Sequence, residues 1–116
     1  MQDFDIPIFK KVYQLYTQFH AVRNKVAKQD RYTIFQKCEN ILIDVIEGII
    51  ESSQMSKDKK LPILEKTSIK LDLLRVFIRL MKDIKSIDLK TYAQLELNID
   101  EIGRMLGGWI KSTKEA

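Results

Sequence analysis

The sequence predicts an all-α protein, an up-down-up-down four-helix bundle, and three observations lead to this fold class. Apolar residues recur at three- and four-residue spacing through four long stretches. No stretch alternates apolar and polar residues as a half-buried strand does. The two prolines, Pro7 and Pro62, stand where a helix is expected to begin, a position at which proline is tolerated. Helices of similar length joined by short connections pack antiparallel to their neighbours, which gives the bundle.

The apolar pattern sets the expected helix boundaries within a single domain spanning residues 1–116. Helices are expected at about residues 8–26, 33–51, 61–85 and 89–110. Asp88 is well placed to cap the fourth helix, because an aspartate oxygen accepts hydrogen bonds from unpaired backbone N–H groups. Residues 112–116 follow the last periodic residue and are expected to fray.

Composition favours a globular, non-secreted protein. Charged residues make up 31% of the 116 residues and hydrophobic residues 45%, with a net charge of +4. The single Cys38 excludes an internal disulfide framework and fits a reducing compartment. No charged-then-apolar leader opens the chain, and no apolar run approaches the ~18 residues of a membrane span. We therefore expect a cytoplasmic protein with no membrane partner.

Basic residues concentrate near the expected ends of the first and third helices. Residues 6–29 contain no acid, and the third helix carries more cations than acids. Since the first and third helices run parallel in this bundle, their C-terminal ends share one end of the molecule. That end would hold a phosphate backbone through converging cations, and Tyr32 beside them could stack on a base. The candidate nucleic-acid-binding residues are Arg23, Lys25, Lys28, Arg31, Arg75, Arg79, Lys82 and Lys85.

The same charges have a simpler interpretation. Cations near helix C-termini stabilise the helix dipole by ~0.3–1 kcal/mol each, and a run of charges is most often a solvated face. A bundle with these charges could also be a structural protein-interaction module that binds no nucleic acid. Both interpretations stay open at the level of charge alone.

The residues needed for most catalytic or metal sites are missing. His20 is the only histidine, which excludes the paired Glu-x-x-His ligands of di-iron bundles and multi-histidine zinc sites. A Cys38–His20 nucleophile pair is disfavoured because both residues occur in apolar-rich helices and are expected in the core. No glycine-rich phosphate loop is present. We expect no enzyme activity, no metal and no cofactor.

The segment from Gly103 to Lys111 holds three of the four glycines and the only tryptophan while continuing a helical pattern. Glycine inside a helix costs about 0.5–1 kcal/mol relative to alanine, so the run needs a compensating gain. Gly103 and Gly107 lie one turn apart and are expected to admit a neighbouring helix or subunit. Gly103, Gly107 and Trp109 are therefore the candidate oligomer interface.

Four segments together resemble a known family. They are residues 6–13, 28–33, 73–80 and 102–111, and the run Gly-Arg-Met-Leu-Gly-Gly-Trp from residue 103 to 109 is the most specific part. The chain resembles the Avd family, the accessory variability determinant proteins of diversity-generating retroelements. These are relatives of the four-helix-bundle proteins encoded in 23S rRNA intervening sequences.

The resemblance implies a four-helix bundle assembled as a homopentamer, with an electropositive surface. It also implies two partners, a reverse transcriptase and nucleic acid, in the error-prone copying of template RNA into cDNA. The family's basic positions carry over to Arg31, Arg75, Arg79 and Arg104. The leading interpretation is thus a non-enzymatic, nucleic-acid-binding accessory protein of a reverse transcriptase, and the alternative is the protein-interaction bundle.

Overall fold

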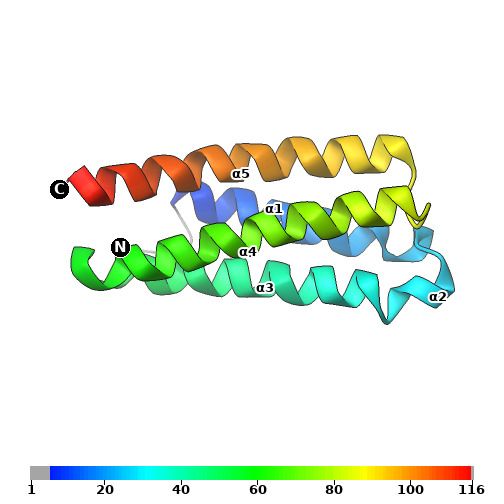
Figure 1. The fold of residues 1–116 in the computed structure, drawn as a ribbon, viewed down its shortest axis with the longest axis horizontal. Coiled ribbons are helices and arrows are strands. Elements are labelled where there is room, and N and C mark those ends of the chain that lie inside the picture. The colour runs from blue at the N-terminus through cyan, green and yellow to red at the C-terminus, as the bar shows by residue number, and fades with distance from the viewer. Residues whose placement is uncertain (1–5, 116) are drawn as a thin grey trace.

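The computed structural model describes residues 6–115, and in that range it contains helices and no strand. Its four long helices run alternately up and down the molecule (Figure 1), which confirms the predicted fold class. In chain order the elements are α1 (Pro7–Val22), the short 3₁₀ turn η2 (Arg23–Lys25), α2 (Lys28–Arg31), α3 (Ile34–Ser53), α4 (Lys57–Asp83) and α5 (Leu89–Glu115).

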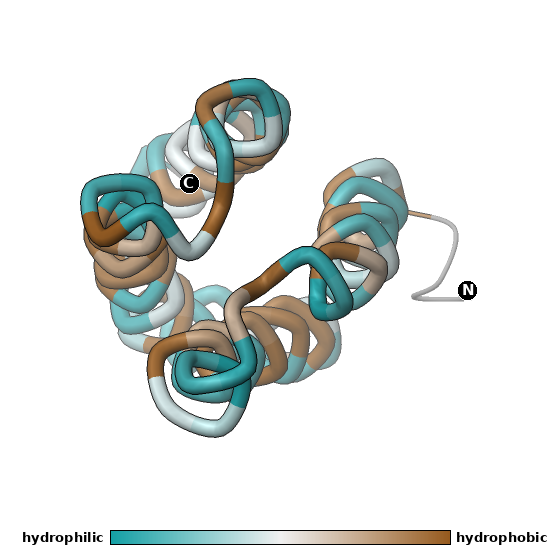
Figure 2. Tube along the Cα trace, turned by 90° about the vertical axis from the view of Figure 1, so that its right-hand side faces the viewer, coloured by the Kyte–Doolittle hydropathy of each residue, from teal (hydrophilic) through white to brown (hydrophobic). Residues whose placement is uncertain are grey.

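The long helices occupy the four corners of an elongated bundle of 45 × 24 × 21 Å (Figure 2). Around the bundle the order is α1, α3, α4 and α5, with α5 returning to contact α1. Helices α1 and α4 stand at opposite corners and run in the same direction, so both end beside α2 (Figure 1). The parallel relation between the first and third long helices is therefore as predicted.

The core follows the predicted apolar stripes. In the half of the bundle near α2, Phe19 of α1 and Phe35 of α3 stack with ring centroids 4.5 Å apart. Cys38 and Met81 meet beside them, both fully buried. Aliphatic side chains continue the core through the rest of the bundle, among them Leu15, Leu42, Val45, Leu64, Leu74, Ile78, Leu95, Ile99, Ile102 and Leu106.

Helices α3 and α4 share the most extensive contact, and Gly48 makes it possible. A Cβ atom added to Gly48 would overlap the Oγ1 of Thr67 and come within 3.2 Å of its Cβ. Thr67 is buried, and its hydroxyl donates a hydrogen bond to the carbonyl of Ile63 at 2.8 Å. The two helices therefore approach closely where one of them lacks a side chain.

Three predicted boundaries were wrong. Helix α1 ends at Val22, and the expected joint after it folds into η2 and α2, because Val26 turns inward and is buried there. Helix α4 begins at Lys57, so Pro62 lies inside it; near a helix start this proline removes one backbone hydrogen bond while its ring stays exposed. Helix α5 continues to Glu115, where Lys114 pairs with Glu65 of α4 at 3.6 Å. Residues 1–5 and 116 lie outside the described part of the chain.

Candidate nucleic-acid interface

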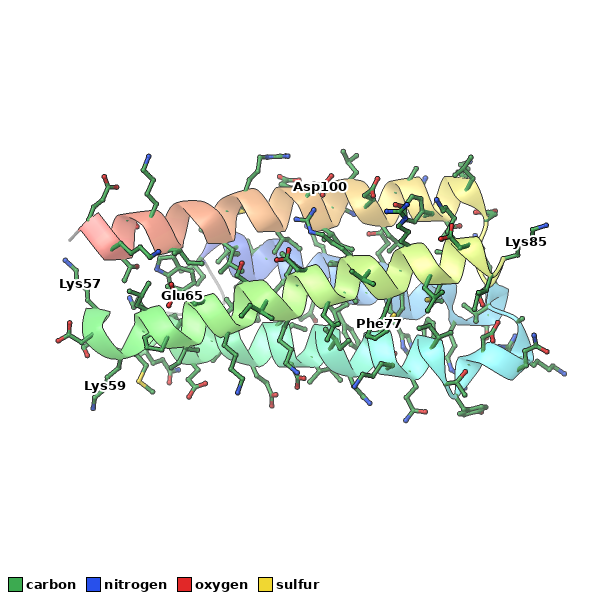
Figure 3. All side chains as sticks on the ribbon, viewed as in Figure 1. Lys57, Lys59, Glu65, Phe77, Lys85 and Asp100 are labelled. Carbon is green, nitrogen blue, oxygen red and sulfur yellow. The ribbon has the colours of Figure 1, made fainter. Side chains whose placement is uncertain are left out.

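Helix α4 ends in a turn that presents a lysine at the end of the bundle. Lys85 has φ 65°, in the left-handed region that favours glycine. The backbone N–H of Ser86 donates to the carbonyl of Met81 at 2.8 Å, and that of Lys85 donates to Lys82 at 3.0 Å, the pair of bonds that defines a Schellman motif. A side chain in this conformation costs roughly 1–2 kcal/mol. The chain nevertheless holds an exposed lysine here, at the tip of the molecule (Figure 3).

The neighbouring connection between α1 and α3 is fixed by its own charged residues. Arg31 donates hydrogen bonds to the carbonyls of Val26 at 3.0 Å and of Asn24 at 3.2 Å. The hydroxyl of Ser86 donates to a carboxylate oxygen of Asp30, which ties α2 to the α4–α5 connection. The two connections therefore form one surface at this end, which we call the basic end.

Three lysines line a hollow of about 490 Å³ in the basic end. Lys25 comes from η2 and Lys82 and Lys85 from the end of α4, while the first turn of α5 closes the other side. Asp88 caps that turn by accepting a hydrogen bond from the backbone N–H of Thr91 at 2.7 Å. Hydrogen bonds from Thr91 lower the pKa of Asp88, and the positive fields of Lys25 and Lys90 lower it further. The hollow is thus mainly cationic with one capping carboxylate.

Two cations at the basic end, Lys82 and Arg23, contact aromatic rings. The Lys82 ammonium lies 4.6 Å from the ring centroid of Tyr92, and the hydroxyl of Tyr92 donates to Glu96 at 2.6 Å, which raises the pKa of Tyr92. The Arg23 guanidinium lies 5.1 Å from the ring centroid of Tyr32, whose side chain is 73% exposed. An exposed ring held by an arginine is a suitable platform for stacking on a base.

Arg75 lies away from this surface. It forms ion pairs with Asp100 of α5 and, at 3.7 Å, with Asp72. Ten residues separate Arg75 from Lys85, about 15 Å along a helix. Its partner Asp100 likewise lies far from Lys85 (Figure 3). Arg79 is exposed one turn further along α4, between Arg75 and the basic end. The structure thus brings Lys25, Lys82 and Lys85 together, with Arg23, Lys28 and Arg31 on the adjoining segment, and it separates Arg75 from them.

The basic end accounts for the net charge of the whole chain. Residues 23–31 and 82–90 carry seven cationic and three acidic side chains, a surplus equal to the chain's +4. The remainder of the sequence is balanced in charge. A phosphate polymer approaching the molecule would therefore meet net attraction at this end.

The family model described as bAvd-like matches residues 7–113, which is nearly the whole chain. The chain belongs to the bAvd-like family. Members of this family are accessory proteins, and the predicted Avd resemblance is confirmed. No curated protein matches the chain.

The residues of the candidate oligomer interface lie toward the end of the bundle opposite the basic end, and they do not form one continuous strip. Gly103 faces α4 within the same chain, because an added Cβ would overlap the guanidinium of Arg75. Gly107 is exposed and open, with nothing near an added Cβ. Trp109 packs against the core at the rim of a hollow of about 300 Å³, with the Lys60 ammonium 5.6 Å from its ring centroid. In this family member Gly103 therefore serves α4–α5 packing.

Arg104 is exposed on α5, remote from the basic end.

The two side chains considered as a nucleophile pair, Cys38 and His20, differ in burial, because one is buried and the other is exposed. Cys38 is buried, and burial raises the pKa of its thiol to about 12, so it stays protonated at neutral pH. His20 is exposed rather than in the core as expected, with its Nδ1 3.1 Å from a carboxylate oxygen of Glu39.

In residues 6–115 no group of acidic, histidine or cysteine side chains is arranged to hold a metal. The helices described there include none long and apolar enough to cross a membrane.

Sequence reasoning missed two contributors to the basic end. Ser86 lies in the joint expected between the third and fourth helices, and its hydrogen bond to Asp30 joins residues 56 positions apart in the chain. The left-handed conformation of Lys85 also gave no signal, because a glycine is the usual marker of such a turn. Both features depend on how the two connections meet in space.

Proposed function

We propose that the chain is a non-enzymatic, nucleic-acid-binding accessory protein of a retroelement reverse transcriptase. It acts in the cytoplasm and supports mutagenic copying of template RNA into cDNA. Membership of the bAvd-like family supports the accessory role. The basic end is the surface that meets the RNA backbone, and Tyr32 adds base stacking.

One observation carries the RNA-binding part of this proposal: the chain's surplus of positive charge lies at one end of the bundle. Complementing helix dipoles would explain lysines near helix C-termini. It does not explain why Lys85 occupies a left-handed position where glycine is favoured. A selective advantage for charge at that tip accounts for both features.

The test compares two double variants with the same change in charge. Lys25→Glu with Lys85→Glu reverses two cations in the basic end, and Lys57→Glu with Lys59→Glu reverses two at the opposite end (Figure 3). Binding to RNA transcribed from the template of the same retroelement is measured by gel shift at several salt concentrations. The first variant should weaken binding more than tenfold and reduce the salt slope by roughly 1.5 units, because about 0.7–0.9 units are lost per phosphate contact.

The control variant should retain affinity within about twofold, a difference of under ~0.5 kcal/mol. Equal losses in both variants would show that only net charge matters and would overturn the basic end as the binding surface. An unaltered affinity in both, with a flat salt response, would favour the alternative, a protein-interaction bundle without nucleic-acid binding.

The proposed partners other than RNA are the reverse transcriptase of the same element and further copies of the chain, in a homopentamer as the family resemblance implies. Light scattering of the purified protein measures the copy number. Tagged protein co-expressed with the reverse transcriptase should retain it through washing at high salt. Loss of the enzyme at moderate salt, or a monomeric mass, would contradict the respective part of the proposal.

A further inference from the structure

Tyr32 has the most exposed aromatic ring among residues 6–115. It is 73% exposed at the C-terminal end of α2, and the Arg23 guanidinium lies 5.1 Å from its ring centroid. The guanidinium can cover only one face of the ring, so at this exposure the opposite face lies in solvent. A base can stack on an aromatic face of this kind.

The other tyrosines are less suited to stacking on a base. Tyr92 lies under the Lys82 ammonium, and Tyr16 stacks on the ring of His20 with centroids 6.2 Å apart. Tyr13 is 59% exposed, but it lies about 14 Å along α1 from the end of that helix. Tyr32 is thus the tyrosine that combines a free face with a place in the basic end.

Hydrogen bonds hold Tyr32 close to the lysine-lined hollow of the basic end. Arg31 directly precedes Tyr32, and its guanidinium donates to the carbonyls of Asn24 at 3.2 Å and of Val26 at 3.0 Å. These two residues flank Lys25, which lines the hollow. One arginine therefore ties the segment that carries the ring to the segment that carries the lysine. Because this arrangement is formed without RNA, little order has to be gained on binding.

An exposed ring distinguishes unpaired from paired RNA. In a single strand the bases can turn out of their stack onto an aromatic side chain. In an A-form duplex each base is paired and stacked on its neighbours, and a protein meets mainly phosphates, 2′-hydroxyls and groove edges. Lysines do not make this distinction, because both forms of RNA present phosphates. Stacking on one base strengthens binding by roughly 5- to 100-fold.

We propose that the basic end selects single-stranded RNA over duplex RNA, and that Tyr32 determines this specificity by stacking on one unpaired base. The inference rests on the proposed RNA binding and names the form of RNA that is bound. The lysines attract the phosphates of either form. Tyr32 adds a contact that only an unpaired nucleotide makes, and Arg23 holds the ring in place from its other face.

The test compares one unstructured RNA strand with the same strand annealed to its complement. Gel shift with the full chain at several salt concentrations measures both dissociation constants. The wild type should bind the single strand at least about fivefold tighter than the duplex, and the preference should grow with salt because duplex binding depends on phosphate contacts. Equal or tighter binding of the duplex would overturn the proposal.

Tyr32→Ser tests the role of the ring. It should weaken single-strand binding at least about fivefold and leave duplex affinity within about twofold. The salt slope for the single strand should stay the same, because stacking neutralises no phosphate. Tyr32→Phe keeps the ring and should retain the preference. Tyr13→Ser is the matched control, which removes an exposed tyrosine remote from the hollow and should change neither affinity.

The variant Lys25→Glu with Lys85→Glu separates this inference from the proposed function. It should weaken binding of both forms, whereas Tyr32→Ser should weaken only one, and circular dichroism confirms that each variant remains helical. If Tyr32→Ser weakens both forms equally or neither of them, the strand selectivity fails while the proposed RNA binding stands. A wild-type protein that binds neither form would overturn both proposals.

Discussion

The two ends of the bundle are constructed in different ways. At the basic end, the connections are held by polar contacts of Arg31, Asp30 and Ser86, and by the hydrogen-bonded turn at Lys85. Toward the opposite end, α3 and α4 meet directly at Gly48, and α5 runs on to Glu115 past two open glycines. Hydrogen bonds of side chains and of the backbone thus hold the connections at one end, and a close approach of two helices at Gly48 marks the packing toward the other.

This difference separates two groups among the cations of the basic end. Arg31 and Lys82 have contacts within the chain that give them a structural role. Lys85 has an unfavourable backbone conformation that lowers stability, and under the proposed function its charge binds RNA. Substitutions that measure stability and RNA affinity together should therefore divide the candidate residues into these groups.

The largest effect on stability is expected from Gly48→Ala. Alanine normally stabilises a helix relative to glycine, but here the new methyl group overlaps Thr67, so the free energy of unfolding should fall by roughly 1–3 kcal/mol in urea titrations. Thr67→Ala in the same chain should recover part of the loss by removing the overlapping atoms. Gly107→Ala is the matched control, and it should raise stability by about 0.5–1 kcal/mol because its surroundings are open. A stabilising Gly48→Ala would disprove the close helix approach.

The second largest effect on stability is expected from Arg31→Ala. The free energy of unfolding should fall by about 1–1.5 kcal/mol, because the carbonyls of Val26 and Asn24 lose their hydrogen-bond donor. Lys28→Ala, at the start of the same helix α2, removes the same charge from an exposed position and should leave stability within about 0.5 kcal/mol. Urea unfolding measures both variants. Similar stability in the two would show that Arg31 has no structural role.

Lys85→Gly should change stability and binding in opposite directions. Glycine relieves the left-handed conformation, so the free energy of unfolding should rise by about 1 kcal/mol. Loss of the charge should weaken RNA binding and reduce the salt slope by roughly 0.7–0.9 units. Lys90→Gly removes a charge without that gain in stability. Lower stability for Lys85→Gly would rule out a strained lysine.

The smallest effect concerns pH and Asp88. Because hydrogen bonds from Thr91 hold the pKa of Asp88 below its ordinary value of 3.8, the carboxylate contributes stability above that value. The contribution should disappear as the pH falls from about 4 through the lower folded pKa. The melting temperature of the wild type should therefore drop more steeply below pH 4 than that of Asp88→Asn. Parallel curves for the two proteins would contradict the assigned cap.

Much of the fold could be predicted from the sequence, because the inward stripes of all four helices follow the spacing of core residues such as Val12, Leu42 and Leu95. The shared end of α1 and α4 followed from topology alone. The details that depend on distant contacts could not be predicted. Spacing gives no sign that Arg75 pairs with Asp100 across α4 and α5, or that His20 turns outward to Glu39.

The fit between Gly103 and Arg75 has a consequence for how the family can vary. The guanidinium of Arg75 occupies the space beside Gly103, so a larger residue at position 103 requires a shorter one at 75. Asp100 would then lose its ion-pair partner. These three positions should therefore change together among bAvd-like proteins, and a long cationic residue at 75 should accompany glycine at 103 as they diverge.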